Sequence, residues 1–563
     1  MKTYTNPVYE YRRPPELDGT VRHRGVVIVG AGPVGLAAAI DLAQRGMPVL
    51  VLDDDDTVSV GSRAICYAKR TLEILDRLGC GEPVAQKGVS WNVGKVFHGD
   101  CLAYQFDLLP EPGHHRPAFV NLQQYYFEEY LVQRAQTLDA AEIRWKHRVV
   151  DVSRDEQGVT LRVATPDGDY ALSCDWLIVC DGARSPVRRL LGLDTEGQVF
   201  RDRFLIADIH MTSDFPTERW FWFDPPFHRN QSVLLHRQAD DVWRVDFQLG
   251  WDADPEEEKK PANILPRLHA MLGADAVFEI EWASVYTFQC RRMQKFHHGR
   301  VVFAGDAAHL VSPFGARGAN SGVQDVDNLV WKLDLVVRGL APESLLDTYD
   351  EERIAAADEN ILHSTRATDF ITPKSVVSRT FRDAALSLAR HHGFARKLVN
   401  SGRLSVPTVL LDSRLNTPTP DHVTFSGAMV PGAPAADAPV FGPRGGWLLD
   451  HLGGTFNLLV FGDAVPAAAA RILAQDPIAC STIQVGGVAQ DGRNVIQDRD
   501  GRLATRYDAQ PNTCYLLRPD QHVCARWREF DPVAVRGAVA RATGHTADTS
   551  IAGNAERTAP CMY

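Results

Sequence analysis

The chain has 563 residues, with 60 Lys and Arg against 71 Asp and Glu, which gives a formal net charge of −11. A single hydrophobic core stops growing beyond roughly 250–300 residues, so this length implies two or three domains. Hydrophobic residues make up 45% and charged residues 23%, a composition that excludes an intrinsically disordered chain. The acidic balance argues against nucleic acid as a partner, because a nucleic-acid binder needs surplus Lys and Arg.

The N-terminal segment, residues 1–24, is polar and lacks the apolar core of a secretory signal. The longest apolar stretch, residues 26–40, is interrupted by glycines and a proline and is too short to span a bilayer. Ten cysteines are scattered without a C-x-x-C pair, which argues against a zinc site or a dithiol redox motif. These features predict a cytoplasmic protein with no membrane partner and no metal site.

A glycine-rich segment follows a short β-branched run at Val27–Val29 and precedes a helix-forming segment. This G-x-G-x-x-G motif spans residues 30–35, and its candidate cofactor-binding residues are Gly30, Gly32, Pro33, Val34 and Gly35. A strand, a tight glycine turn and a helix N-terminus together hold a dinucleotide diphosphate. A second strand, residues 48–52, ends at Asp53, whose carboxylate can accept hydrogen bonds from ribose hydroxyls. We therefore predict a Rossmann-like dinucleotide-binding domain.

Three further acidic residues follow Asp53. Asp54 is a further candidate ligand of the dinucleotide, although a solvated loop over residues 54–56 is the more ordinary interpretation of such a run. Four adjacent carboxylates would repel the 2′-phosphate of NADP by like-charge repulsion. The nucleotide bound at this site is therefore expected not to be NADP.

Two later motifs indicate which dinucleotide is bound. Each is an apolar strand that ends in a short turn, and the turns are Asp181-Gly182 and Gly305-Asp306. A glycine-containing loop at residues 313–320 and a helix over about residues 321–337 follow the second turn. Together with the first motif, this order and spacing resemble the class A flavoprotein monooxygenases, the FAD-dependent aromatic hydroxylases, over roughly residues 25–370.

The resemblance implies FAD as the bound dinucleotide. Asp306 would bind the ribityl hydroxyls of the flavin, and Asp181 would take part in binding FAD and the reduced nicotinamide. The helix N-terminus and Arg317 would stabilise negative charge on the reduced flavin, although Arg317 could instead be a solvent-facing loop cation. The loop residues that would lie against the isoalloxazine ring are Pro313, Gly318, Ala319 and Asn320.

Two smaller motifs carry the same resemblance. Residues 63–73 match a family segment R-x-x-G-x-x-x-R-T-x-E, in which Arg63 would pair with the FAD diphosphate through its planar guanidinium. Cys66 stands where the family segment has glycine, so the local backbone is open to question. Gln124 matches a family glutamine on the flavin side; the alternative is a polar residue on an amphipathic helix.

Between the FAD segments, residues 200–290 contain several strand patterns that predict a mostly antiparallel substrate-binding sheet. The strand at residues 283–291 resembles the strand that enters the active site of phenol hydroxylases. On this likeness Tyr286 would contact the substrate hydroxyl, and a core tyrosine is the equal alternative. The further substrate candidates are Tyr67, Phe288 and Gln289, and the catalytic candidates are Tyr286, Pro313 and Arg317.

The resemblance implies an α/β fold: a Rossmann-like FAD-binding domain, an inserted mostly antiparallel substrate domain and a thioredoxin-like C-terminal domain. The last domain lacks the redox motif C-x-x-C, so it is expected to be structural or dimer-forming. The expected domains are a tail (1–24), the FAD-binding domain (25–200 and 295–375), the substrate sheet (200–295), a helical segment and linker (376–435), and the thioredoxin-like domain (436–563).

The family resemblance implies a single-component aromatic hydroxylase of the kind that serves the catabolism of aromatic compounds. NADH or NADPH would reduce FAD, O2 would add at flavin C4a, and the hydroperoxide would hydroxylate a small phenolic substrate. The open alternatives are a tailoring oxidase or epoxidase of polyketide-like aromatics, and a flavoprotein that does not hydroxylate. A halogenase is disfavoured, because residues 220–222 do not continue into the W-x-W-x-I-P motif. A homodimer is a further expectation.

Overall fold

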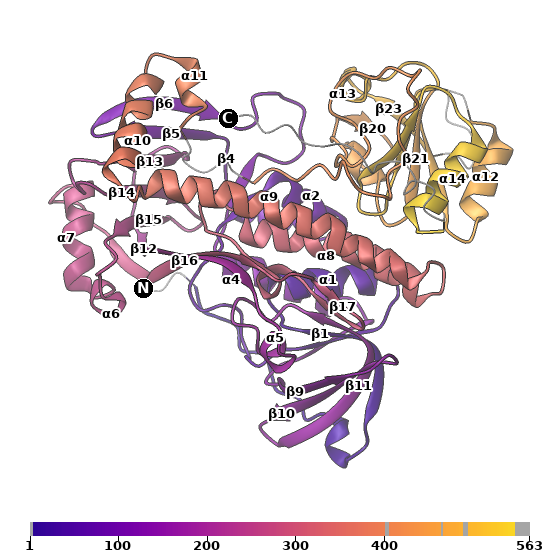
Figure 1. The fold of residues 1–563 in the computed structure, drawn as a ribbon, viewed down its shortest axis with the longest axis horizontal. Helices are drawn as coiled ribbons and strands as arrows, with labels where there is room; N and C mark the ends of the chain where they lie inside the picture. Colours follow the sequence, from indigo (N-terminus) through magenta and orange to yellow (C-terminus); the bar gives the residue numbers. More distant parts are fainter. Residues whose placement is uncertain (1–3, 400–404, 463–464, 488–493, 546–563) are drawn as a thin grey trace, which may run out of the picture. The chain divides into compact units, whose positions relative to one another are not determined.

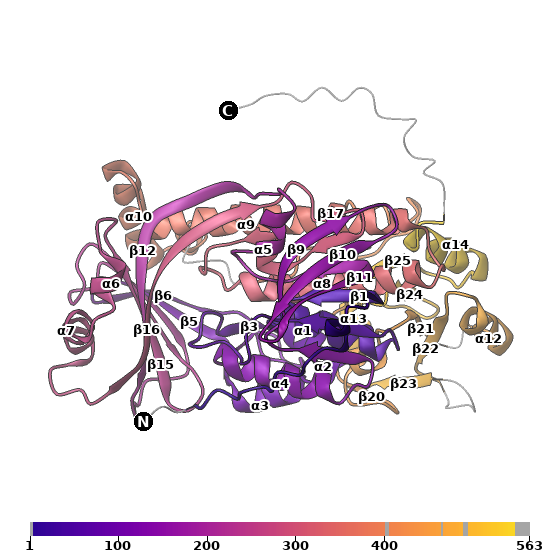
Figure 2. The ribbon, with the colours of Figure 1, turned by 90° about the horizontal axis from the view of Figure 1, so that it is seen from below.

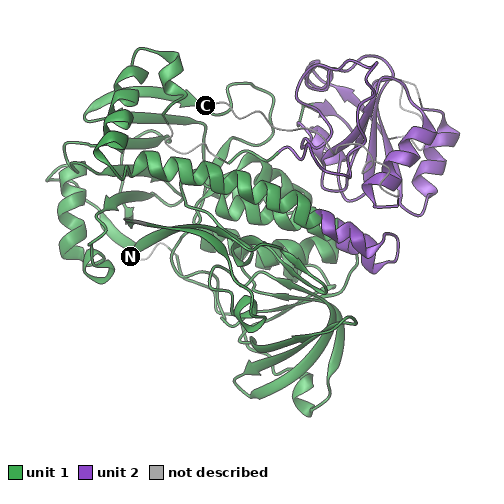
Figure 3. Ribbon diagram, in the orientation of Figure 1, with its two compact units in different colours: residues 1–331, 349–408, 437–439 green, residues 332–348, 409–436, 440–563 purple. Residues whose placement is uncertain are grey.

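The computed structural model describes residues 4–399, 405–462, 465–487 and 494–545. The chain divides into two compact units, which Figure 3 colours separately. Unit 1 comprises Met1–Trp331, Tyr349–Thr408 and Asp437–Pro439, and unit 2 comprises Lys332–Thr348, Val409–Ala436 and Val440–Tyr563. Within the described ranges, no helix has the length and apolar character needed to cross a membrane.

The first sheet of unit 1 is built around a parallel core. Its strands are β1 (Arg22–Val29), β2 (Val49–Leu52), β8 (Ala141–Arg144), β9 (Arg148–Arg154), β10 (Val159–Thr165), β11 (Gly168–Val179), β17 (His297–His298) and β18 (Val301–Phe303). The parallel strands lie in the order β8-β2-β1-β11-β18, which by sequence is 3-2-1-4-5, the order of a Rossmann sheet. The predicted Rossmann-like architecture is confirmed.

The second sheet has eight strands in the order β19-β16-β12-β15-β14-β13-β5-β6. They are β5 (Val93–His98), β6 (Cys101–Asp107), β12 (Glu196–His210), β13 (Arg219–Phe223), β14 (Ser232–Arg237), β15 (Val242–Leu249), β16 (Glu279–Arg292) and β19 (His309–Leu310). β12 and β16 are long antiparallel partners that curve side by side in Figure 2. β5 and β6 come from outside the predicted range 200–295. β5 pairs with β13 in parallel, and because parallel neighbours are not joined by a hairpin, no turn in the sequence indicates this pairing.

A third, small sheet and the helices complete unit 1. The strands are β3 (Cys66–Ala68), β4 (Val89–Trp91) and β7 (Phe119–Asn121). The helices of the N-terminal two thirds are α1 (Pro33–Gln44), α2 (Lys69–Leu78), α3 (Gly81–Lys87), α4 (Gln124–Gln136), α5 (Pro186–Leu190), α6 (Pro255–Glu258) and α7 (Pro261–Leu272). They are followed by α8 (Gly318–Val337) and α9 (Asp347–Ile371), which lie mainly in unit 1 but extend into the Lys332–Thr348 segment of unit 2. The remaining helices of unit 1 are α10 (Val376–Ala389) and α11 (Gly393–Arg396). Figure 1 shows α8 and α9 as neighbouring long helices.

The second sheet buries an apolar cluster on each face. One cluster includes Phe204, Phe288 and Phe314 and packs against α9 and α10, while the other includes Trp243 and Phe247 and packs against α7. Many of the aromatic side chains of residues 200–290 therefore belong to the core. The first cluster also contacts Tyr286, so this face of the sheet borders the candidate site.

Unit 2 contains a mixed sheet in the order β20-β23-β22-β21-β24-β25. Its elements are β20 (Val440–Phe441), β21 (Phe456–Phe461), α12 (Ala467–Gln475), β22 (Cys480–Val485), β23 (Asn494–Asp498), α13 (Arg502–Arg506), β24 (Cys514–Leu517), β25 (Val523–Trp527) and α14 (Pro532–Ala542). β21, β22 and β23 are parallel, whereas β24 and β25 run antiparallel to their neighbours. Cys480, Cys514 and Cys524 of this unit are free and buried.

Candidate active site

The glycine-rich turn lies between β1 and α1, and glycine suits each of its three positions for a different reason. Gly30 has a φ of +105°, and a Cβ there would lie 2.5 Å from the Cys180 carbonyl oxygen. A Cβ at Gly35 would overlap the Gly30 carbonyl oxygen, so α1 packs directly on the turn. Gly32 faces open space, with no other part of the chain within 4 Å of a Cβ built on it. Because α1 begins at Pro33, this open backbone lies at a helix N-terminus, where a diphosphate can bind.

Asp53 follows β2 and fixes the glycine turn. Its Oδ2 accepts a hydrogen bond from Ala31 N at 2.5 Å, and its Oδ1 accepts one from Asp55 N at 2.9 Å. Burial raises the pKa of the Asp53 carboxyl to about 6. Asp54 is exposed and makes no hydrogen bond or ion pair with any residue that the structure describes. This exposure is what the solvated-loop interpretation of Asp54 expects.

Arg63, Tyr286 and Asp306 form the polar centre of the candidate site. Asp306 lies in the short 3-10 helix η2 (Gly305–Ala307), and its side chain is open to solvent. The surrounding protein raises the pKa of the Asp306 carboxyl by desolvation, while His309 and Arg63 oppose the shift. The exposed Arg63 guanidinium makes no hydrogen bond or ion pair with the described part of the chain. Tyr286 interacts electrostatically with both charged groups, so three distant segments meet at this point.

Two helix N-termini converge on the Gly305-Asp306 turn. α8 begins beside the carboxylate, since a Cβ at Gly318 would lie 3.8 Å from Asp306 Oδ1. Val34, at the start of α1, packs against Gly305 and Gly322, where a Cβ would lie 2.9 Å and 2.6 Å from Val34 Cγ2. The positive ends of both helix dipoles are therefore available to one anionic ligand.

Asp325 of α8 holds the turn in place. Its Oδ2 accepts hydrogen bonds from Gly305 N at 3.0 Å and from His309 Nε2 at 2.6 Å, and its Oδ1 accepts one from Arg353 Nε at 2.7 Å. Burial acts to raise the pKa of this carboxyl, but His309 and Arg353 hold it below the ordinary value. Sequence reasoning missed this network, because one acid inside a helix carries no local signal of partners in other elements.

Asp181 ends β11 and leads into α5. Its Oδ2 accepts a hydrogen bond from Val187 N at 3.0 Å, whereas its Oδ1 is buried without a hydrogen-bond partner in the described residues. Burial raises the pKa of the Asp181 carboxyl to about 6. Arg188 donates to Ala183 O at 3.0 Å and to Ala307 O at 2.7 Å. This arginine, which the sequence did not single out, joins the Asp181 turn to the Asp306 turn.

The loop before α8 is tightly held. Arg317 is 2% exposed and donates from Nη1 to Asn360 Oδ1 of α9 at 2.5 Å, so the alternative of a solvent-facing cation is wrong. Ala316 has a φ of +53°, a left-handed conformation that favours glycine. Pro313 is exposed, and Ala319 is half-buried at the start of α8.

The side-chain amides of Asn320 and Gln124 are hydrogen-bonded to other groups of the protein. Asn320 accepts from and donates to groups of the neighbouring β3 and α2 region and its own loop, at 2.5–2.9 Å. Its partners are Cys66 O, Ala68 N, Thr71 Oγ1 and Ala316 O. Gln124 is held by three groups of the same region, which are Ser59 Oγ, Ala64 N and Glu128 Oε1. A ligand would meet these two residues through atoms other than the amides.

The substrate candidates separate into two groups. Tyr286 is half-buried, and its ring centroid lies 5.5 Å from that of the buried Phe288, on the same face of β16. Gln289 points to the other face by strand alternation, so it is not brought together with Tyr286. Tyr67 is fully buried, stacks on Phe127 at 4.1 Å between ring centroids, and donates to a backbone carbonyl. The structure therefore gives Tyr67 a packing role and does not bring it to the site.

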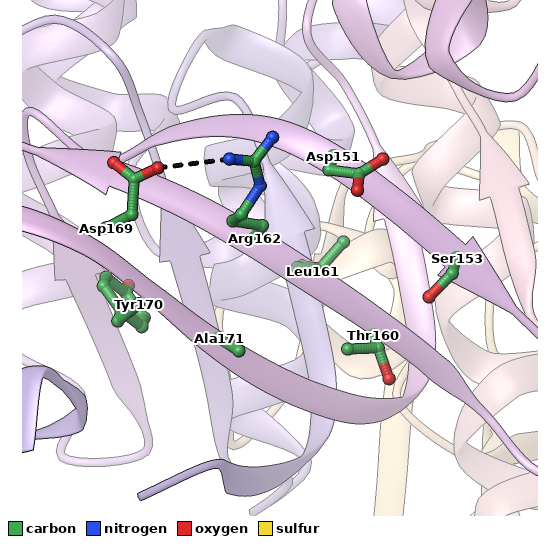
Figure 4. A pocket seen from close by; sticks show the side chains of 8 residues that line it. All are labelled: Asp151, Ser153, Thr160, Leu161, Arg162, Asp169, Tyr170 and Ala171. Atoms are coloured by element: carbon green, nitrogen blue, oxygen red, sulfur yellow. Dashed lines mark hydrogen bonds and ion pairs between the residues drawn. The ribbon is translucent and has the colours of Figure 1, made fainter. Parts of the chain in front are cut away.

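Two surface hollows lie outside this group. One, of about 280 Å³, is lined by Asp151, Ser153, Thr160, Leu161, Arg162, Asp169, Tyr170 and Ala171 of the β9–β11 region, and Figure 4 shows the Arg162–Asp169 ion pair across it. The other, of about 360 Å³, includes Asp54 together with Lys146 and Arg148. Neither contains Arg63, Tyr286 or Asp306, so we do not assign the chemistry to them.

The residues around the Asp306 turn fit FAD. The open backbone at Gly32 and the unpaired Arg63 guanidinium suit a diphosphate, and the solvent-open Asp306 carboxylate suits hydroxyl groups. The buried Asp181 Oδ1 is a further acceptor with no partner among the described residues. A family model described as an FAD binding domain matches residues 24–364.

Three monooxygenases and hydroxylases are similar to more than half of the chain. A 3-(3-hydroxy-phenyl)propionate/3-hydroxycinnamic acid hydroxylase of Mycolicibacterium smegmatis is 28% identical over 533 residues, which is 88% of this chain and 89% of the relative. A 12-dehydrotetracycline 5-monooxygenase/anhydrotetracycline 6-monooxygenase of Streptomyces rimosus is 34% identical over 61% of this chain and 68% of the relative. A para-nitrophenol 4-monooxygenase of a Pseudomonas species is 31% identical over 58% of this chain and 82% of the relative.

Solved structures share the fold. The flavin-dependent monooxygenase PieE, in complex with FAD and substrate, has a TM-score of 0.78 at 22% identity and covers 93% of this chain and 99% of its own. Aklavinone-11 hydroxylase, with FAD and aklavinone, has a TM-score of 0.73 at 23% identity over 93% and 100% of the two chains. The family model and the curated relatives together show that this chain belongs to the FAD-dependent aromatic monooxygenases.

Proposed function

We propose that this chain is a single-component hydroxylase that uses NADH or NADPH and O2 to hydroxylate a phenolic or related aromatic compound. The observation that carries the proposal is the meeting of Arg63, Tyr286 and Asp306 beside the N-terminus of α8. The Arg63 guanidinium could bind a diphosphate, the Asp306 carboxylate could accept hydrogen bonds from ribityl hydroxyls, and the Tyr286 hydroxyl could contact an aromatic substrate.

The chain's own residues would bind and orient FAD. The Gly32 backbone and Arg63 would hold the diphosphate, Asp306 would hold the ribityl hydroxyls, and Asp53 and Asp181 would assist from the two neighbouring strand ends. When bound, the flavin supplies hydride acceptance and O2 activation. The sequence holds one convincing dinucleotide fingerprint, so the reduced nicotinamide would dock transiently.

Tyr286 would position the substrate. Burial, followed by the nearby Asp306 carboxylate, raises the pKa of its hydroxyl to about 12, so this hydroxyl stays protonated and can donate to the substrate oxygen. That hydrogen bond favours the electron-rich, deprotonated form of a phenol. Phe288 and Phe314, which pack together at 5.1 Å between ring centroids, would form an apolar wall that excludes water.

Arg317 and the loop before α8 would act on the charge of the reduced cofactor. Arg317 is a buried cation close to the N-terminus of α8, so its charge adds to the positive end of the helix dipole. Pro313, Gly318, Ala319 and Asn320 would lie along the ring. The Asn320 amide is already bonded to the protein, so its ring contact would come from the backbone.

The second candidate function is the tailoring of a polyketide-like aromatic compound. It is favoured by the 34% identity to the Streptomyces rimosus tetracycline monooxygenase and by the fold shared with aklavinone-11 hydroxylase. A polycyclic substrate needs more room over the flavin than a single phenolic ring. A panel of compounds that ranges from simple phenols to polycyclic ketides therefore separates the two functions.

The test uses purified protein loaded with FAD. We expect NADH or NADPH oxidation to be stimulated by an aromatic substrate, with a product that carries one added oxygen by mass spectrometry. Oxidation that no aromatic compound stimulates, with no oxygenated product, would contradict both candidate functions. A comparison of NADH with NADPH in the same assay identifies the reductant.

For unit 2 we infer a thioredoxin-like structural role without redox chemistry, including support of a homodimer. The strand order β25-β24-β21-β22, with one parallel pair at β21–β22, supports the likeness. The thiols of Cys480 and Cys514 have pKa values raised to about 12 by burial, which suits inert core thiols.

A further inference from the structure

A group of charged side chains on the second sheet has fewer partners than its burial requires. Arg219 of β13 is 5% exposed, and it makes no hydrogen bond or ion pair with any residue in the described ranges. Asp246 of β15 is largely buried, and its Oδ1 lacks a hydrogen-bond partner among those residues. His236 of β14 lies 4.0 Å from Asp246 Oδ2 through Nε2 and 4.0 Å from Cys66 Sγ through Nδ1. Buried charges are ordinarily paired, because desolvation without a partner is unfavourable.

Strand register puts this group on the face that carries Tyr286. Tyr286 pairs with Phe204 of β12, and Asp246 pairs with Ile206 of the same strand. Side chains that lie opposite each other share a face, and residues two apart along one strand share it too. Asp246 and Tyr286 therefore project from one face of the sheet, in adjacent cross-strand rows.

The same reasoning places Arg219 and His236 beside Asp246. Asp246 pairs with Leu234 of β14, so His236, two residues farther along, is on the same face. The β13–β14 register places Arg219 opposite His236. β13 and β16 are four strand spacings apart, about 19 Å, and the Arg219 row lies four residues, about 13 Å, from the Tyr286 row along the strands. The two backbone positions are therefore about 23 Å apart, so both long side chains must extend toward an aromatic molecule that lies between them.

Two contacts connect this face to the flavin side. The Cys66 carbonyl oxygen accepts a hydrogen bond from Asn320 Nδ2 of α8 at 2.9 Å, while the Cys66 thiol approaches His236. Arg244 of β15 donates to the Arg63 carbonyl oxygen at 3.3 Å. Cys66 therefore links His236 to Asn320 at the start of α8, and Arg244 links the same face of the sheet to the loop that carries Arg63.

We propose that Arg219 binds an anionic oxygen substituent of the aromatic substrate, and that His236 and Asp246 complete this recognition site. The inference rests on the proposed function and specifies its substrate class as aromatic acids. Arg219 needs an anion, Tyr286 suits the ring hydroxyl, and both lie on one face of the sheet. An arginine suits this role because its planar fork matches a carboxylate or phenolate oxygen.

The surrounding charges leave Arg219 free to bind an anion. Arg244 and Asp208 neutralise each other through hydrogen bonds of 2.8 Å. Burial lowers the pKa of His236 well below its ordinary value, so its imidazole is neutral, and burial raises the pKa of the Cys66 thiol to about 11. Burial also raises the pKa of Asp246 to about 7. An anion bound to Arg219 would favour protonated Asp246, because two adjacent negative charges repel each other.

The experiment titrates FAD-loaded protein with four probes and follows the flavin absorbance. The probes are 3-(3-hydroxyphenyl)propionate, its neutral counterpart 3-propylphenol, 3-phenylpropionate, and para-nitrophenol. We expect the wild type to bind the hydroxy acid more tightly than 3-propylphenol, and Arg219→Gln to weaken acid binding by roughly 10²-fold. Arg237→Gln, on the same strand as His236 but ion-paired to Asp241 at the surface, is the matched control and should leave all four dissociation constants unchanged.

The probes also identify the anion. Binding of 3-phenylpropionate that depends on Arg219 assigns the site to a carboxylate, whereas dependence seen with para-nitrophenol alone assigns it to a phenolate. Arg219→Gln that leaves every dissociation constant unchanged would overturn the proposal. Wild-type protein that hydroxylates neutral phenols without preference for acids would also overturn it while leaving the proposed function intact. Selective acid binding without any oxygenated product would instead contradict the function alone.

Two further measurements exclude a merely structural role. The melting temperature of substrate-free Arg219→Gln should equal or exceed that of the wild type, because the variant removes an unpaired buried charge. A large fall in melting temperature would assign Arg219 to the scaffold and contradict the proposal. Acid binding by the wild type should weaken above about pH 7, where Asp246 ionises, and Asp246→Asn should abolish this dependence. An unchanged pH profile in Asp246→Asn would remove Asp246 from the site.

Discussion

Helix α8 and the sheet face that carries Arg219 both bury charged side chains, but they differ in pairing. On the sheet face Arg244 and Asp208 pair with each other, whereas Arg219 makes no hydrogen bond or ion pair with the described residues. On α8, Asp325 is bonded to His309 and Arg353, and Asp327 is bonded to Arg70 and Arg77. Asp325 and Asp327 each have an arginine from another element. Such pairs are costly to break, because the partner left behind is a buried charge without compensation. The network around α8 therefore has the character of a scaffold for the turns that face the cofactor.

The sheet face and the Asp306 turn show the opposite arrangement. Arg219 and Arg63 make no hydrogen bond or ion pair with the described residues, and Asp246 and Asp181 each retain an oxygen without a partner there. Unsatisfied polar groups of this kind lower the stability of the free protein and are retained where a ligand satisfies them. The comparison separates residues that stabilise the fold from residues that are available to a ligand. Substitution of the first kind should lower the free energy of unfolding, and substitution of the second kind should weaken ligand binding or activity without lowering it.

The largest expected effect comes from the paired network. Asp325→Asn leaves Arg353 and His309 without their buried anion, so we expect a loss of about 3–5 kcal/mol in the free energy of unfolding. Urea denaturation of the FAD-free protein measures it. Asp358→Asn, which breaks the exposed Arg292–Asp358 pair, is the control and should lose no more than about 1 kcal/mol. Equal losses in the two variants would show that the α8 network is not a scaffold.

Tyr286→Phe tests an open group at the site. Loss of the hydroxyl removes the hydrogen bond to the substrate oxygen, so hydroxylation should fall by roughly 10²-fold, the low end for one proton-transfer group. FAD content and the unfolding midpoint should stay unchanged, and hydrogen peroxide should rise as reduced nicotinamide is consumed without product. An unaltered rate and coupling would return Tyr286 to the core, the alternative that its contact with Phe288 supports.

Asp306→Ala should act on the cofactor alone. The variant deletes a carboxylate that would accept hydrogen bonds from ribityl hydroxyls, so we expect the dissociation constant for FAD to rise about tenfold. Recovery of FAD fluorescence on dilution measures the affinity, and the melting temperature of the FAD-free protein is the control. Full FAD occupancy and activity in Asp306→Ala would mean that the Gly305-Asp306 turn does not contact the flavin.

The sequence predicted the parts of this site that are local in the chain. The glycine turn at Gly30–Gly35, Asp53 and the Gly305-Asp306 turn each follow a strand. Gly30 and Gly305 have φ values of +105° and +61°, a local conformation that favours glycine and so leaves a signal in one segment of the sequence. The strands of residues 200–290 and the helix near residues 321–337 were predicted from local patterns of the same kind, whereas α6 and α7 were not predicted. α8 begins three residues before the predicted start near residue 321, because Gly318–Asn320 looked like loop residues.

What could not be predicted depends on pairing between distant segments. β5 joins the second sheet by a parallel contact with β13, so no connecting turn marks it in the sequence. Arg219, His236 and Asp246 come from three different strands, β13, β14 and β15, and only the pairing of these strands brings them together. Tyr67 shows the reverse case: a matching motif suggested a substrate contact, but stacking on Phe127 buries the ring.

The smallest predicted effect concerns backbone strain in the loop before α8. Ala316 directly precedes Arg317 and adopts a φ of +53°, a left-handed conformation that a Cβ makes unfavourable. Ala316→Gly should relieve this strain but also give the unfolded chain more freedom, so we expect a net gain of about 0.5–1 kcal/mol in the free energy of unfolding. Urea denaturation measures it, with Ala319→Gly in the first turn of α8 as the control that should be destabilised. A loss of stability in Ala316→Gly would show that packing of Ala316 against the apolar cluster that includes Cys66 and Phe119 outweighs the backbone strain. If Ala316→Gly is more stable but hydroxylates more slowly, then Ala316, like Arg219, lowers the stability of the protein and supports its activity.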